Sequence, residues 1–261
     1  MLKIDKRIKI SIITPSYNSA DFIAETIEAI QAQTYPHWEL LITDDCSTDD
    51  TCKIISQYCE KDNRIKLFHL PTNGGAGKAR NNSIKEAKGR FIAFCDSDDK
   101  WYPEKLEKQL KFMLDNNYEL TYTSYNVTDE PGNPIGKVKC LKRLSYRTLL
   151  RDNGIGCLTA MYDSQRIGKM YMPLIRKRQD WCLWLSIIKK TRYAYGLQEY
   201  LSIYRERKNS ISANKIEMLH HNYRVYNEVE GYGKVTSFFL LMGYFMPYYF
   251  YKKIKNKFFN H

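Results

Sequence analysis

Residues 90–99 read Arg-Phe-Ile-Ala-Phe-Cys-Asp-Ser-Asp-Asp, an apolar run of strand length that ends in three carboxylates. Further apolar runs rich in Ile, Phe or Tyr lie at 8–14, 38–43, 65–70 and 120–125. Helical patterns separate these runs, at 21–33, 47–60, 76–88 and from Pro103 onward. This alternation predicts an α/β fold with a mainly parallel central sheet flanked by helices.

The composition fits one large domain, with or without an appendage, because 43% of the 261 residues are hydrophobic and 27% are charged. The seven cysteines form no Cys-x-x-Cys pair, and an odd number argues against a disulfide framework. Residues 1–20 show no secretory signal. We therefore expect a reducing, cytoplasmic location.

Charge is distributed unevenly along the chain. Residues 1–130 contain 17 Lys and Arg against 21 Asp and Glu, whereas residues 131–261 contain 24 against 8. A strongly basic second half indicates a polyanionic partner, which could be nucleic acid or an anionic membrane surface.

Four unusual segments follow predicted strands, at 14–18, 44–45, 73–81 and 96–99. In an open parallel sheet, ligands bind at the carboxyl ends of the strands, so these segments are candidates for one shared site. The acidic segment is the sharpest signal: Asp96, Asp98 and Asp99 repel one another unless a cation lies between them. Oxygen ligands of this kind suit Mg²⁺ or Mn²⁺. The alternative is a solvated acidic turn that caps the helix at Pro103.

The segments at 44–45 and 73–81 have two interpretations each. Asp44 or Asp45 could accept an N–H from a uracil-like base, or could prepare the entry to the helix that Ser47 caps. The glycine-rich segment 73–81 could bring backbone N–H groups and Lys78 or Arg80 to a diphosphate at a helix N-terminus. It matches neither a Walker P-loop nor a Gly-x-Gly-x-x-Gly fingerprint, and could be a plain helix entrance.

Taken together, the motifs make residues 8–212 resemble the family-2, GT-A-fold glycosyltransferases. The resemblance rests on Thr-Pro-Ser-Tyr-Asn at 14–18, Gln-Thr-Tyr-Pro-His-Trp-Glu at 33–39, Asp-Asp-Cys-Ser-Thr-Asp at 44–49, Gly-Lys-Ala-Arg-Asn at 77–81 and Phe-Cys-Asp-Ser-Asp-Asp at 94–99. It implies a GT-A nucleotide-diphospho-sugar transferase fold over 1–212, with a nucleotide-binding part at 1–125 and an acceptor-binding part at 126–212.

The resemblance also implies roles for individual residues. Pro15 and Tyr17 would line the base pocket, Asp45 or Asp44 would contact uracil, and the acidic segment would hold the metal and the donor diphosphate. The residues expected on the donor side are Pro15, Tyr17, Asn18, Asp44, Asp45, Gly77, Lys78, Arg80, Asp96, Ser97 and Arg205. Those expected at the Mn²⁺ or Mg²⁺ ion are Asp96, Asp98 and Asp99.

Family members carry their catalytic base in a later acidic motif, usually Glu-Asp before an apolar helix. Here the matching run is Gln-Asp-Trp-Cys-Leu-Trp at 179–184, so Asp180 alone can be the base. The alternative role for Asp180 is a helix N-cap. Trp181 and Arg178 are the expected acceptor contacts, although aromatic residues at helical spacing are more often core.

A second family segment lies further along, at 204–205 and 210–212, and is thought to close over the donor diphosphate. Arg205 or Arg207 would supply positive charge there. The alternative is a mobile basic surface loop.

The C-terminal segment 213–261 reads as helical, basic and aromatic. Residues 235–251 carry no charge and are followed by lysines, but 17 residues are short for a spanning helix. Such a segment suits the membrane interface, where it would anchor the protein. The alternative is a helix packed on the domain or in a homodimer interface.

The expected activity is inverting transfer of a hexose from UDP-glucose or UDP-galactose, giving a β-linkage. By resemblance to O-antigen, capsule and teichuronic-acid transferases, the acceptor would be a sugar on undecaprenyl diphosphate, at the cytoplasmic face of the inner membrane.

Two competing functions are a nucleotidyltransferase and a nucleic-acid-binding protein. The first would place a glycine-rich loop after the first strand, where this chain has Pro-Ser-Tyr at 15–17. The second lacks any recognition motif, so we expect no nucleic-acid partner.

Overall fold

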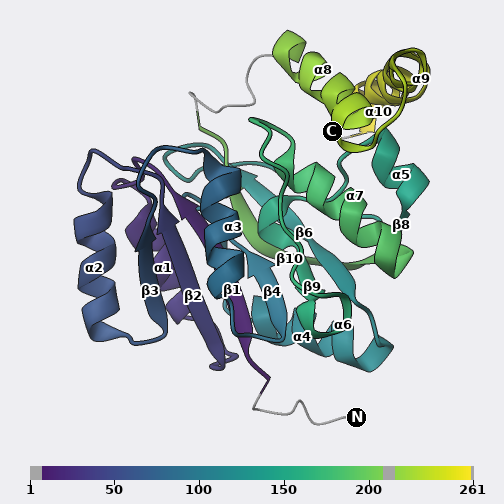
Figure 1. The fold of residues 1–261 in the computed structure, drawn as a ribbon. Coiled ribbons are helices and arrows are strands. Elements are labelled where there is room, and N and C mark those ends of the chain that lie inside the picture. The colour runs from purple at the N-terminus through teal and green to yellow at the C-terminus, as the bar shows by residue number, and fades with distance from the viewer. Residues whose placement is uncertain (1–7, 208–214, 260–261) are drawn as a thin grey trace.

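The computed structural model describes residues 8–207 and 215–259 (Figure 1). The predicted segment at 210–212 lies outside the described residues. The first half contains, in chain order, β1 (Ile10–Ser16), α1 (Ile23–Gln31), β2 (Trp38–Asp44), α2 (Thr51–Lys61), β3 (Ile65–His69), α3 (Ala76–Glu86), β4 (Phe91–Phe94), β5 (Lys100–Trp101), α4 (Lys105–Asn116) and β6 (Leu120–Thr128). The second half contains β7 (Pro134–Val138), β8 (Arg143–Ser145), α5 (Tyr146–Arg151), η1 (Cys157–Thr159), β9 (Met161–Asp163), α6 (Ser164–Ile167), α7 (Gln179–Thr191), β10 (Tyr193–Arg205), α8 (Lys215–Arg224), η2 (Val225–Val229), α9 (Lys234–Phe239), η3 (Leu240–Phe245) and α10 (Met246–Phe259).

All these strands belong to one sheet, in the order β3-β2-β1-β4-β9-β6-β10-β5, with β7 paired to β6 and β8 to β10. The β3–β2, β2–β1, β1–β4 and β6–β10 pairs are parallel. The strands β5, β7, β8 and β9 pair antiparallel with their neighbours. The α/β fold with a mostly parallel central sheet is therefore confirmed, and short antiparallel strands extend this sheet.

The strand order reverses at β1, which has β2 on one side and β4 on the other. Chain connections leave β1 and β4 in opposite directions across the sheet, so a crevice opens at the carboxyl ends of these strands. The segments after β1, β2 and β4 are three of the four motifs singled out in the sequence. The fold thus brings them to one edge.

Alternating side chains of the central strands build two separate cores. Ile10, Ile12 and Leu40 face the layer that contains α1 and α4, whereas Ile13 and Leu41 face the opposite layer. The second layer holds α3, α7 and the C-terminal helices (Figure 1). Because both faces of the strands are covered, their apolar side chains are buried in both layers.

One local expectation is wrong. Helix α2 begins at Thr51, and Ser47 does not cap it. Asp49 Oδ1 accepts the Thr51 N–H at 3.1 Å, while the Ser47 N–H donates to Asp44 Oδ2 at 2.8 Å. Ser47 therefore organises the loop after β2 instead of the helix.

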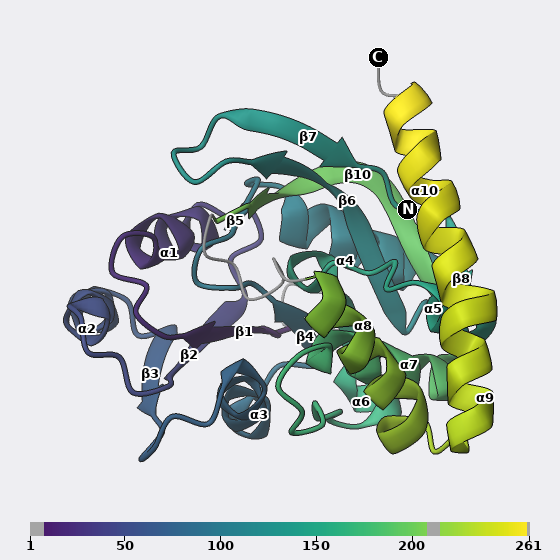
Figure 2. The same ribbon diagram turned by 90° about the horizontal axis from the view of Figure 1, so that it is seen from above.

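The C-terminal helices pack on the domain, and Figure 2 shows α9 and α10 running as one long rod along its side. Leu241 and Phe245 are buried, and the Phe245 ring lies 6.4 Å from that of Trp181. The opposite face of the same helices remains exposed. No helix in the described part of the chain combines the length and the apolar character needed to cross a bilayer.

Candidate active site

The loop after β2 is organised by two buried carboxylates with different partners. Asp45 accepts the N–H of Gly74 at Oδ1 and that of Gly75 at Oδ2, both at 2.7 Å. Asp44 accepts from the hydroxyls of Ser16 and Ser47 and from the Ser47 N–H. Asp45 therefore ties β2 to the glycine-rich segment. Each of its oxygens keeps a lone pair for a base, so the uracil contact stays a prediction.

Residues 15–18 present one open aromatic ring beside this loop. Pro15 is buried within β1, opposite Thr43 of β2, whereas the Tyr17 side chain is 49% exposed. Asn18 holds the loop after β2, since its Oδ1 accepts the Thr48 N–H at 2.9 Å. Tyr17 is thus the residue of this segment that is free to stack on a base.

The glycine-rich segment forms the entrance to α3. Gly75 has φ 82°, a conformation that side chains rarely adopt, so glycine is required there. A Cβ on Gly77 would lie 2.8 Å from Cδ of Gln179, so α3 and α7 approach closely at this point. Lys78 is half-buried at the first turn of α3, with no carboxylate within ion-pair distance among the described residues. It remains available to an anion.

The acidic turn after β4 divides its three carboxylates. Asp96 Oδ1 accepts from Arg80 at 2.6 Å, and Asp98 lies 3.6 Å from Arg207 Nη1. Asp99 is buried and accepts the Arg205 N–H at 3.1 Å. Burial raises the pKa of Asp98, and repulsion from Asp96 raises it further. Burial together with repulsion from Asp98 and Asp96 holds the pKa of Asp99 well above its usual range.

The donor set of this turn fits a divalent cation. Asp96 and Asp98 are partly exposed carboxylates whose mutual repulsion a cation would relieve, and Mg²⁺ and Mn²⁺ prefer such oxygen ligands. Asp99 instead faces the backbone of β10. Its assignment as a metal ligand stays a prediction, and the geometry favours Asp96 and Asp98.

Arg205 lies in a different setting from the one expected. Its guanidinium is buried, pairs with Glu25 Oε2 at 2.6 Å and donates to the Glu130 carbonyl at 3.1 Å. These contacts fasten β10 to α1. Arg207 lies 3.6 Å from Asp98 of the acidic turn, so of these two arginines it is the better candidate for the donor diphosphate.

Asp180 lies in the first turn of α7, where Arg178 with φ 66° is the N-cap residue. Its Oδ2 accepts from Asn153 Nδ2 at 2.8 Å. Burial disfavours the charged form of Arg80, but Asp96 and Asp180 outweigh it, so the pKa of Arg80 is raised. The field of Asp180 also acts on Cys157, together with that of Asp96. Helix α3 connects Asp180 to the acidic turn, because Gly77 lies against Gln179, which precedes Asp180, and Arg80 donates to Asp96.

The two expected acceptor residues differ in their placement. The Trp181 side chain is 1% exposed, its Nε1 donates to the Leu149 carbonyl at 2.7 Å, and its ring packs edge-on against Tyr226. We correct its role to core packing, because no ring face is open to a sugar. Arg178 donates to Asn222 Oδ1 at 2.7 Å. Burial lowers the pKa of Arg178, although the negative charges of Asp180 and Asp152 act to raise it. Arg178 therefore stays beside the candidate base.

Sequence reasoning missed three residues between the acidic turn and α7. These are Asn153, Cys157 and Tyr125. Burial raises the pKa of Tyr125 to about 12, and the negative charges of Asp99, Asp152 and Asp180 contribute to this rise. They come from β6 and from the loop and η1 after α5. No motif marks them, because the fold alone brings them to this point.

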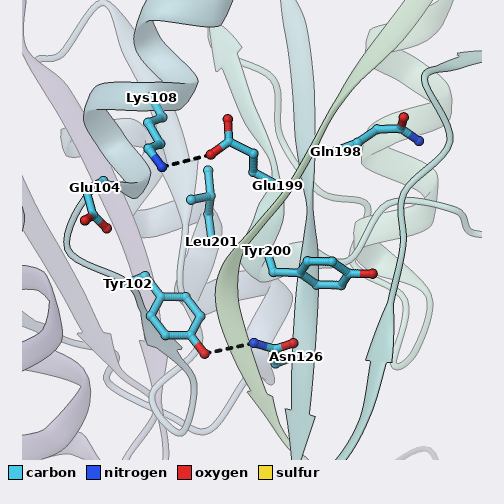
Figure 3. Close-up of a pocket in the computed structure, with 8 residues that line it drawn as sticks. All are labelled: Tyr102, Glu104, Lys108, Asn126, Gln198, Glu199, Tyr200 and Leu201. Carbon is cyan, nitrogen blue, oxygen red and sulfur yellow. Dashed lines mark hydrogen bonds and ion pairs between the residues drawn. The ribbon is translucent and has the colours of Figure 1, made fainter.

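A separate surface pocket lies between β6, β10 and the start of α4 (Figure 3). Lys108 and Glu199 form an ion pair at 2.9 Å in it, and Asn126 donates to the Tyr102 hydroxyl at 2.8 Å. None of the predicted site residues lines this pocket. The candidate site is instead the edge formed by the ends of β1, β2 and β4 together with α7.

An α/β sheet with acidic and glycine-rich segments at its strand-order reversal defines a class of nucleotide-binding enzyme folds. The family model described as glycosyl transferase family 2 matches residues 11–170, and the chain belongs to this family. It is 45% identical over 222 residues to the putative teichuronic acid biosynthesis glycosyltransferase TuaG of Bacillus subtilis, covering 85% of this chain and 88% of that protein. It is 40% identical over 211 residues to WfgD of Escherichia coli, covering 80% and 82% respectively. WfgD is described as a UDP-Glc:alpha-D-GlcNAc-diphosphoundecaprenol beta-1,3-glucosyltransferase.

Solved structures confirm the GT-A fold. TarS 1–349 of S. aureus in complex with UDP matches with a TM-score of 0.69 and 20% identity, over 95% of this chain and 74% of that chain. The mannosyltransferase PcManGT of Pyrobaculum calidifontis, in complex with GDP-Man and Mn²⁺, matches with a TM-score of 0.67 and 19% identity, over 87% and 66%.

Proposed function

We propose that this chain is an inverting hexosyltransferase that moves glucose or galactose from a UDP-sugar to a sugar on a lipid diphosphate, in bacterial surface-polysaccharide synthesis. One observation carries the proposal: helix α3 contacts both parts of the site, because Gly77 lies against Gln179, the neighbour of Asp180, and Arg80 donates to Asp96 at 2.6 Å. This arrangement supports a candidate base close to the carboxylates suited to a donor diphosphate. The names of TuaG and WfgD support the substrate class.

The proposed reaction is a single displacement. Asp180 takes the proton of the acceptor hydroxyl while that oxygen attacks the anomeric carbon, and UDP leaves from the opposite face. Asn153 holds Asp180 by one carboxylate oxygen, which leaves the other for the proton. A divalent ion held by Asp96 and Asp98 would supply charge stabilisation for the departing diphosphate. Lys78 and Arg207 add positive charge on the same side.

The base of the donor would be held at the edge of β1 and β2. Tyr17 offers an exposed ring for stacking, and Asp45 offers acceptor oxygens to a uracil N–H. An α-linked donor sugar would give a β-glycoside, because one displacement inverts configuration.

A donor screen tests the proposal. Purified protein with a short-chain lipid-diphosphate N-acetylhexosamine acceptor and Mn²⁺ is expected to release UDP from UDP-glucose or UDP-galactose. Release should depend on the acceptor and should be absent with GDP-mannose. The proposal fails when no UDP-sugar gives acceptor-dependent release.

The exposed face of α9 and η3 supports peripheral binding to the cytoplasmic face of the inner membrane. Val235, Phe238, Phe239 and Met242 are exposed and recur at helical spacing, so they form one apolar stripe. Lys234 is exposed at the start of the long rod, whereas Lys252 pairs with Asp152 Oδ2 at 2.7 Å. An exposed apolar stripe on a helix suits a bilayer surface, where a lipid-linked acceptor would be found.

Single aspartates on this stripe are expected to release the protein from membranes. Val235→Asp and Phe239→Asp, at side chains that are 71% and 66% exposed, should each weaken binding about tenfold or more, because burial of such a side chain contributes about 1.5–3 kcal/mol. Sedimentation with vesicles containing an anionic lipid measures the change. Point variants are preferable to deletion of residues 235–261, because the deletion would remove Phe245 and uncover Trp181.

The matched control is Ile135→Asp on β7, where the side chain is 53% exposed. Binding that drops equally in this control would show a general effect of charge. Unchanged binding in both stripe variants would contradict the anchor and favour a second copy of the chain as the occupant of this face.

A further inference from the structure

Three side chains with metal-binding atoms converge at a point that the proposed reaction does not use. An Asp44 carboxylate oxygen, Cys52 Sγ and a His69 ring nitrogen all lie within 4.8 Å of one another. Among residues 8–207 and 215–259, this is the one group of three or more His, Cys, Asp or Glu side chains that converges so closely. The group joins the ends of two strands to a helix start, because Asp44 ends β2, His69 ends β3 and Cys52 lies in the first turn of α2.

The backbone holds these three residues in place. Asp44 and His69 are opposite one another in the parallel pairing of β2 and β3. The Leu70 N–H donates to the Asp44 carbonyl at 2.9 Å, which continues this pairing beyond His69. Cys52 lies in the first turn of α2, next to Thr51, which Asp49 anchors. The three ligands therefore come from fixed elements and need small side-chain movements only.

The separation of the atoms matches a tetrahedral site. Zn–S bonds of about 2.3 Å and Zn–N bonds of about 2.0–2.1 Å at tetrahedral angles place sulfur and nitrogen roughly 3.6 Å apart. Cys52 Sγ lies 3.9 Å from His69 Nδ1, which is long for a hydrogen bond but close to this value. Asp44 is buried, Cys52 is half-buried and His69 is exposed, so a cation could enter from solvent.

Asp44 has one position left for a cation. Its oxygens accept three hydrogen bonds from Ser16 and Ser47, and the Cys52 thiol approaches as a further donor. A bound metal would take the place of the thiol hydrogen. The S–H bond breaks, a metal–sulfur bond forms, and the proton passes to solvent. The serine contacts would then orient the ligating carboxylate as outer-shell partners do.

We propose that Asp44, Cys52 and His69 form a site for Zn²⁺ or a similarly thiophilic divalent cation, with a fourth position open to water. A thiolate and an imidazole select such a metal over the Mg²⁺ or Mn²⁺ that suits the acidic turn. The site connects β2, β3 and α2 around the loop that carries Asp45. Metal binding would therefore stiffen the base side of the donor site.

Cobalt absorbance on the full chain tests the site directly. Chelator-treated protein titrated with Co²⁺ is expected to develop a thiolate-to-cobalt charge-transfer band at one equivalent, and Zn²⁺ should abolish it. Cys52→Ser should remove the band. His69→Ala, at an exposed side chain, should weaken Co²⁺ binding at least about tenfold, since loss of an outer-shell partner alone has that effect.

Two controls separate this site from others. Cys59→Ser changes another half-buried thiol of α2 and should keep the band. Asp98→Ala should also keep it, because carboxylates give no sulfur charge transfer. A protein without the band, a band that survives in Cys52→Ser, or an unchanged Co²⁺ affinity in His69→Ala overturns the proposal whatever the donor screen shows.

Discussion

Asp180→Asn is expected to lower transfer about 10²–10⁴-fold, the usual contribution of a general base. The amide has the shape of the carboxylate but cannot take the acceptor proton. Its oxygen can still accept from Asn153 Nδ2, so the first turn of α7 should keep its structure. UDP affinity, measured by calorimetry, should stay near that of the unchanged protein. Turnover within about tenfold of the unchanged protein would remove Asp180 from its role.

A companion variant tests whether Asn153 positions the base. Asn153→Ala should lower kcat about ten- to hundredfold, because a hydrogen bond to a charged group contributes about 1.5–3 kcal/mol, while the donor KM stays unchanged. Asn126→Ala is the matched control, since its Nδ2 donates to Tyr102 in the pocket of Figure 3, which Asp180 does not line. The positioning role would be contradicted if kcat fell in the control alone, or if kcat stayed unchanged in both variants.

The second large effect concerns Asp98. In the presence of Mn²⁺, Asp98→Ala is expected to lower UDP affinity about ten- to hundredfold, because one of two carboxylates suited to the ion is lost. Without metal, the substitution should not lower UDP affinity. The variant removes repulsion toward Asp96 and frees Arg207, so metal-free UDP affinity should be equal or higher.

Calorimetry with and without Mn²⁺ separates the two effects of Asp98→Ala. Asp50→Ala is the control, an exposed carboxylate 3.9 Å from Lys53 on the surface of α2. An Asp98→Ala protein that keeps the full metal-dependent gain in UDP affinity would contradict the metal assignment.

The central part of the fold was predictable because each strand there is covered on both faces. Ile12, Ile42 and Phe94 lie in strands whose residues are all buried, and the polar segments after these strands mark the sheet edge. The strands β5, β7 and β8 were not predictable in this way. They are short, and β7 is exposed along its whole length, so burial leaves no pattern in the sequence.

The location of the candidate site was predictable, because its motifs follow strands. The partners of its side chains were less predictable, because tertiary contacts determine them. Asp45 and Asp96 occupy the edge that their positions implied. The partners of those carboxylates could not be read in advance: Arg80 turns onto Asp96, and Gly74 donates to Asp45. For Trp181 the sequence position was misleading. This aromatic residue is adjacent to the candidate base in sequence, but it belongs to the core because Tyr226 and Phe245 cover its ring.

The anomeric configuration of the product tests the central claim most directly. That claim is a single displacement in which Asp180 deprotonates the acceptor while UDP leaves near Asp96 and Asp98. The coupling constant of the anomeric proton, measured by NMR on the product from UDP-α-glucose or UDP-α-galactose, reports the configuration. A β-glycoside is the predicted result. An α-glycoside would contradict the account, because retention requires a second displacement for which no step is assigned.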